Sequence, residues 1–146
     1  MTDKTGQCMC GAVTFTATDV PSTASICHCE MCRRWTGSAL IGVDLPTAGL
    51  TWHNEAQIAT LQSSDWAERA WCRRCGSALY FHFTLNEDMA AWTEVPIGLF
   101  DDPSAFEITS EIYIDEKPHS FAFEGADRRK QMTRAECVKK FPALDS

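Results

Sequence analysis

Eight cysteines in a chain of 146 residues limit what this protein can fold into more than any other feature. Seven of them form three tight groups, which we call the first pair, the triad and the last pair: Cys8 and Cys10; Cys27, Cys29 and Cys32; Cys72 and Cys75. Closely spaced thiols chelate one ion at little cost in chain entropy, because the loop that closes is short. A C-x-x-C turn brings two sulfurs within about 2.3 Å of a tetrahedral ion. The pattern therefore predicts zinc sites rather than disulfides or a redox pair.

Other features of the sequence are consistent with cysteines that stay reduced. The polar segment 1–7 lacks the apolar stretch of a secretory signal, so we expect a cytoplasmic setting, in which thiols stay reduced. No run of 18 apolar residues is present, so we expect no membrane span. The chain has 13 basic and 20 acidic residues, a net charge of −7, which disfavours non-specific binding of nucleic acid. The oligomeric state is left open.

Seven clustered cysteines divide naturally into four and three. A structural zinc takes four protein ligands, whereas a catalytic zinc keeps three and one position for water or substrate. In one partition the last pair joins Cys29 and Cys32, which leaves the first pair with Cys27. In the other, the first and last pairs combine and the triad stays together on one short segment, as expected of an open site. The spacing alone does not choose between them.

A closed second site is the alternative to an open one. Its fourth ligand would be a histidine, and the chain has four: His28, His53, His82 and His119. His28 lies between two triad cysteines, and on an extended segment its side chain would point away from theirs. Two closed sites would make the protein a non-catalytic, zinc-stabilised binding module. The eighth cysteine, Cys137, is predicted to be a small buried residue on a helix.

The apolar pattern predicts a mainly β protein with a short C-terminal helix, in a single zinc-binding domain over residues 1–146. Alternating or continuous apolar segments indicate strands over 12–17, 39–43, 55–62, 78–84, 89–99, 108–115 and 121–123. Thr133 and Glu136 fit a capping box, and the helix that follows is predicted to stop at Pro142 with Cys137 and Phe141 on one face.

Two arginine pairs accompany the cysteines. Arg33 and Arg34 follow the triad directly, and Arg73 and Arg74 lie inside the last pair. Four thiolates on Zn²⁺ carry a net negative charge, which nearby guanidinium groups offset. Arg33 or Arg34 can alternatively contact an anionic substrate, a role that suits the guanidinium fork.

The segments CMCGAV (8–13), CHCEMCRRWTGS (27–38) and WCRRCGSAL (71–79) set all seven cysteines beside characteristic glycines. With residues 98–103 and 112–118, they resemble the family of glutathione-dependent formaldehyde-activating enzymes, which includes centromere protein V. The resemblance covers about residues 7–124 and leaves a basic helical tail, 125–146, outside it.

This resemblance implies a β-tent, in which antiparallel sheets fold around zinc. It also implies that the first and last pairs hold a structural zinc and that Cys27, Cys29 and Cys32 hold a second zinc assigned to catalysis. The expected activity is a zinc-dependent carbon–sulfur lyase with two Zn²⁺ per chain. Its expected substrate is a glutathione–aldehyde adduct, such as S-hydroxymethylglutathione, or a related thiol conjugate.

Overall fold

The computed structural model describes residues 2–144, which contain eleven strands and three short α-helices. These elements form two compact units, one of residues 1–22 and 43–106 and the other of residues 23–42 and 107–146. Strand β4 (Leu40–Pro46) begins in the second unit and ends in the first. Among residues 2–144, no helix has the length and apolarity that a bilayer crossing requires.

The first unit is built from antiparallel strands. Three of them form a small sheet in the order β1 (Thr2–Gln7), β2 (Thr14–Val20) and β5 (Leu50–His53). The others follow the order β4, β9 (Trp92–Pro96), β8 (Ala78–Phe83), β7 (Ala67–Cys72) and β6 (Ile58–Ser64). Val13 and Phe15 are both buried, as their alternation predicts. Cys8 and Cys72 belong to a buried cluster with Val13 and Leu79, and their partly buried partners Cys10 and Cys75 pack against it.

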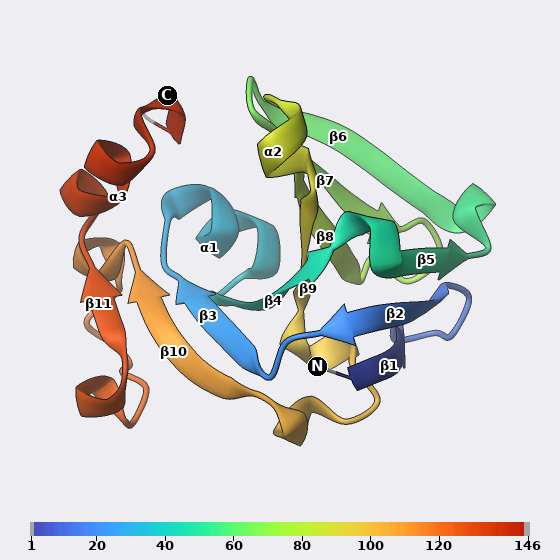
Figure 1. Ribbon diagram of the computed structural model, residues 1–146, viewed down its shortest axis with the longest axis horizontal. Coiled ribbons are helices and arrows are strands. Elements are labelled where there is room, and N and C mark those ends of the chain that lie inside the picture. The colour runs from blue at the N-terminus through green and yellow to red at the C-terminus, as the bar shows by residue number, and fades with distance from the viewer. Residues whose placement is uncertain (1, 145–146) are drawn as a thin grey trace. The chain divides into compact units, whose positions relative to one another are not determined.

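The second unit places one strand between two parallel neighbours. Figure 1 shows β10 (Glu107–Ile112) flanked by β3 (Thr23–Cys27) and β11 (Lys130–Met132). β10 runs parallel to both, whereas β3 pairs antiparallel with β4. The resemblance implies antiparallel sheets, and the two pairs that β10 forms are parallel additions to them. Parallel pairing requires a long connection between the strands, and residues 28–106 and 113–129 supply one for β3 with β10 and for β10 with β11.

Two helices complete the second unit: α1 (Glu30–Thr36) and α3 (Arg134–Lys140). The predicted capping box of α3 is present, because the Glu136 amide donates to the Thr133 hydroxyl and the Thr133 amide donates to the Glu136 carboxylate. Cys137 is buried as predicted. Phe141 ends the helix instead of packing beside Cys137, and 47% of its surface is exposed.

The mainly β prediction and the C-terminal helix are confirmed, but some segments differ. Residues 121–123 form no strand, because the Phe121 and Phe123 rings pack against His28 outside any ladder. The predicted strand 89–99 is shorter, since the Asn86 side chain caps a short helix, α2 (Glu87–Ala90), and β9 starts only afterwards. The tail 125–146 is not only helical, since it also contributes β11.

Candidate metal centres

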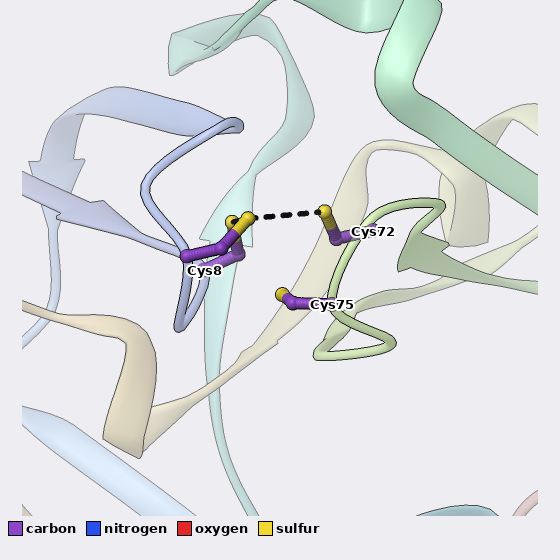
Figure 2. Close-up of side chains that lie close together, drawn as sticks. Cys8, Cys72 and Cys75 are labelled. Atoms are coloured by element: carbon purple, nitrogen blue, oxygen red, sulfur yellow. Dashed lines mark hydrogen bonds between the residues drawn. The ribbon is translucent and has the colours of Figure 1, made fainter.

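Two tight turns carry the first and last pairs. Cys8 and Cys10 lie in the segment after β1, whereas Cys72 ends β7 and Cys75 lies in the turn that leads to β8. Figure 2 shows the sulfurs of Cys8, Cys72 and Cys75 directed toward one another from facing loops. A glycine with positive φ follows each pair, Gly11 at 78° and Gly76 at 78°, where a side chain would be strained.

The four sulfurs of the two pairs fit a tetrahedral ion. They all lie within 4.8 Å of one another, with 3.6 Å from Cys8 Sγ to Cys10 Sγ and 3.9 Å from Cys10 Sγ to Cys72 Sγ. A tetrahedral zinc with sulfurs at about 2.3 Å spaces neighbouring sulfurs by about 3.8 Å. The distances are therefore those of a set of ligands around one ion, and they are too long for a disulfide.

Hydrogen-bond donors surround these sulfurs but do not favour thiolates equally. The Val13 amide donates to Cys8 Sγ at 3.3 Å, and the Ala12 amide approaches Cys10 Sγ at 3.5 Å. The Ala12 amide lowers the pKa of the Cys10 thiol, yet desolvation and the neighbouring thiols outweigh it and raise that pKa to about 11.

The Ser77 hydroxyl lies 3.2 Å from Cys75 Sγ. This hydrogen bond, with further ones from the Ser77 and Cys10 backbone, lowers the pKa of the Cys75 thiol to about 5. Ser77 also accepts the Met9 amide at 3.0 Å, so one hydroxyl links the two cysteine turns.

The triad forms a second group on one short segment. Cys27 ends β3, Cys29 caps the start of α1 and Cys32 lies in its first turn. The three sulfurs lie within 4.8 Å of one another, and the Cys32 amide donates to Cys29 Sγ at 3.4 Å. Cys27 and Cys32 are buried, whereas Cys29 is partly exposed, so the group is accessible from the side of Cys29.

The close approach of the three triad thiols opposes the ionisation of Cys27 when no cation is bound. Hydrogen bonds with the Cys29 and Cys32 thiols raise the pKa of Cys27 well above its ordinary value, and burial adds to the effect. A divalent cation would offset this repulsion, because metal ligation deprotonates a thiol. A group of three sulfur ligands therefore suits a borderline-soft ion such as zinc.

Among residues 2–144, the triad has no fourth metal-binding side chain within 4.8 Å of all three sulfurs. His28, the nearest candidate in sequence, bonds Glu111 instead, with 2.6 Å from Nε2 to the carboxylate. His82 lies beside Glu68 and the Ala90 carbonyl. The structure thus groups the sulfurs of the first and last pairs together and those of the triad apart from them.

Two residues beside the triad were not singled out from the sequence. Glu111 is almost fully buried and receives His28 on one oxygen and Arg129 and Gln131 on the other, at 3.4 and 3.2 Å. Tyr113 packs with the triad at a positive φ of 54°, and burial raises its pKa to about 12. An acidic residue in the middle of a predicted strand was the available signal for Glu111.

The two arginines that follow the triad have different surroundings. Arg34 forms an exposed ion pair with Glu30, 3.0 Å from Nε to the carboxylate. Arg33 lines a cavity of about 340 Å³ in the second unit, together with His28 and Phe121. Of the two predicted anion contacts, only Arg33 faces this cavity.

Comparison with known proteins identifies the family of this chain. The family model for glutathione-dependent formaldehyde-activating enzymes matches residues 3–116, which include all seven clustered cysteines. The chain belongs to this family.

Two individual proteins are also similar to this chain, one in sequence and one in fold. Over 142 residues the present chain is 30% identical to an uncharacterized lyase of Schizosaccharomyces pombe. The alignment covers 95% of this chain and 97% of the relative. A crystal structure of a Rhodobacter sphaeroides protein shares the fold at a TM-score of 0.55 and 22% identity, over 66% of this chain and 87% of that one. Family membership and the lyase relative support an enzyme of lyase type with glutathione-related chemistry.

Proposed function

We propose that this protein is a zinc-dependent carbon–sulfur lyase that joins glutathione, or a similar thiol, to formaldehyde or another small aldehyde. The observation that carries the proposal is the three-sulfur group at Cys27, Cys29 and Cys32, which no fourth metal-binding side chain completes among residues 2–144. Three protein ligands are the arrangement of catalytic zinc sites, which keep one position for water or substrate.

The two groups of sulfurs have different roles in this proposal. Cys8, Cys10, Cys72 and Cys75 would hold a structural zinc, because their four sulfurs complete a tetrahedron and lie in a buried cluster. The triad would hold the second ion. Thiols that hold zinc have to stay reduced, so the proposed location is the cytoplasm.

The reaction is the addition of a thiol to a carbonyl. A carbon–sulfur bond forms while the S–H bond and the π bond of the carbonyl break. The carbonyl becomes a C–O single bond, and the thiol proton ends on the new hydroxyl. A bound zinc would lower the pKa of a substrate thiol from about 8.5 and hold its sulfur. Three thiolates make zinc a weaker Lewis acid than three imidazoles would, so the protein is expected to position the sulfur more than to polarise the aldehyde.

The chain's own residues would position the substrate. Cys29 leaves one side of the triad accessible, whereas Cys27 and Cys32 are covered. Tyr113 packs against the triad with a pKa of about 12, so its hydroxyl keeps its proton at neutral pH and can donate a hydrogen bond near the sulfurs.

The test is the rate at which glutathione and formaldehyde exchange with S-hydroxymethylglutathione, followed by NMR exchange spectroscopy with zinc-loaded protein. We expect exchange above the buffer rate, loss of that excess in Cys29→Ser, and its retention in Cys137→Ala. Exchange at the buffer rate with fully zinc-loaded wild-type protein would refute the proposed activity. A second, non-catalytic role as a binding module would then remain.

A further inference from the structure

Strand β6 (Ile58–Ser64) has a neighbour on one side only. It pairs antiparallel with β7 and ends the strand order of its ladder, and Figure 1 shows the two strands side by side. Among the described residues, no strand pairs with β6 on its other side. An edge strand directs a row of N–H and C=O groups away from its sheet, so this edge can accept a second strand.

The residues of β6 lack the usual protection of an edge. Segment 56–64 contains no charged residue and no proline, so neither a charge nor a missing N–H keeps another strand away. Thr60, Leu61 and Gln62 are exposed in the middle of the strand, and Leu61 is 58% exposed. The register shift in the pairing with β7 lies between Gln62 and Ser64, which leaves residues 58–62 as a regular stretch.

The Gln62 side chain leaves the edge uncovered. Its Nε2 donates to the Ser64 carbonyl and to the Thr84 hydroxyl, at 2.8 Å each. Thr84 follows β8, which pairs with β7 on the side away from β6. The longest side chain in the exposed middle of β6 is therefore directed back over the sheet instead of across its open edge.

The other sheet edges are shorter or charged. β11 has three residues and begins with the exposed Lys130, and β5 has four residues. β1 carries Asp3 and Lys4, and its Thr5 carbonyl accepts the Asp101 amide at 3.0 Å. In the described part of the chain, β6 is thus the edge strand that is both long and uncharged.

Charge and symmetry favour a second copy of this chain as the partner. Each copy carries a net charge of −7, so two copies approach most easily where their surfaces are neutral, and β6 is such a surface. An antiparallel pair of identical strands satisfies the same groups in both copies across a two-fold axis. Pairing the stretch 58–62 with itself sets Thr60 opposite Thr60 and Ala59 opposite Leu61. The exposed leucine of each copy then meets a small apolar residue of the other.

We propose that two copies of this protein associate through β6, antiparallel about a two-fold axis at Thr60, and so continue one sheet across both copies. The contact is one short strand per copy, which is small for a permanent dimer, so we expect a dissociation constant of about 10–100 µM. No cysteine takes part in the contact, so the proposal does not depend on the proposed function.

Sedimentation of reduced, zinc-loaded protein between about 1 and 500 µM tests the association. We expect the average mass to rise from 16.3 kDa toward twice that value as the concentration increases. Salt should strengthen the association, because it screens the repulsion between two acidic copies. A mass of 16.3 kDa at every concentration, or an association that salt weakens, would overturn the proposal.

Charges placed at Thr60 test the contact itself. Thr60→Lys and Thr60→Glu each set like charges opposite one another, so each variant alone should associate about three- to tenfold more weakly than the wild type. An equimolar mixture should recover the association, because lysine then meets glutamate. The matched control is the same pair of substitutions at Thr51, an exposed threonine on the edge strand β5, which should change association by less than about twofold.

Leu61→Lys tests the apolar part of the contact and should weaken association about tenfold. Leu85→Lys is its control, because Leu85 is 44% exposed and lies after β8, away from the edge, so association should stay within about twofold. Circular dichroism checks the fold of each variant, and if Leu61→Lys does not fold, the Thr60 mixture decides alone. Equal effects at Thr60 and Thr51, equal effects at Leu61 and Leu85, or no recovery on mixing would overturn the proposal.

Discussion

At the scale of single residues, the turns that carry the cysteines require glycine at positions with a positive φ. Gly76 has φ of 78°, and a Cβ added there would meet no atom within 4 Å, so replacing it costs backbone strain and nothing else. Its amide donates to the Cys72 carbonyl at 2.8 Å, which closes the turn that presents two sulfurs. The glycine in this motif therefore serves the geometry of the metal centre.

Gly76→Ala should lower the free energy of unfolding by about 1–2 kcal/mol, because an alanine is strained in the left-handed region. Urea unfolding with excess zinc measures the change. Gly98→Ala is the matched control, since a Cβ there also meets nothing within 4 Å and its φ is not positive. Equal effects of the two substitutions would contradict the argument from strain.

Cys137 is the residue that best separates an open from a closed second site. It is buried in the same cluster as Cys27 and Cys32, yet its sulfur is not among the three that lie within 4.8 Å of one another. Cys137→Ala should therefore cost about 1 kcal/mol of packing energy and leave the zinc content unchanged. Mass spectrometry of the metal content checks this, and loss of one zinc would identify Cys137 as a ligand.

At the scale of secondary structure, apolar alternation found the strands that have one clearly apolar face. It located β2 and β8, in which Phe15 and Leu79 are buried. It did not find β1, whose six residues are almost all polar, because backbone pairing with β2 and not an apolar face defines that strand. The short helix α1 was also missed, since a cysteine caps it instead of a typical capping residue.

The N-terminal cap of helix α3 was predicted from the sequence and is present in the structure. Thr133→Ala removes the hydroxyl that accepts the Glu136 amide and should lower the free energy of unfolding by about 1 kcal/mol. Thermal unfolding of the zinc-loaded protein measures this. Lys139→Ala, on an exposed position of the same helix, should change it by less than about 0.5 kcal/mol. A loss no larger than that of the control would mean that the cap does not stabilise the helix.

At the scale of the whole molecule, the sequence pointed to the seven closely spaced cysteines, which the structure gathers into two groups. Spacing alone left two partitions, because it cannot say which distant turns meet; the fold decides that by bringing Cys10 and Cys72 to 3.9 Å. The buried Glu111 and its partners were not predictable, since Glu111 lies in β10, His28 follows β3, and Arg129 and Gln131 lie just before and in β11.

The two metal centres should differ in what their loss does to the fold. Cys72→Ser removes a ligand from the buried core of the first unit and should leave the protein unfolded or insoluble, because structural zinc contributes directly to folding. Cys29→Ser, on the partly exposed side of the triad, should keep the circular dichroism spectrum and lose about one zinc. Equal loss of fold in both variants would contradict this division of roles.

The most direct test of the account is zinc X-ray absorption spectroscopy on reduced protein, with the metal content measured on the same sample. We predict two zincs per chain with an average of about 3.5 sulfur ligands, rising toward about 4 when glutathione is added. One zinc or none per chain, or four sulfurs per zinc before any thiol is added, would contradict an open three-cysteine site.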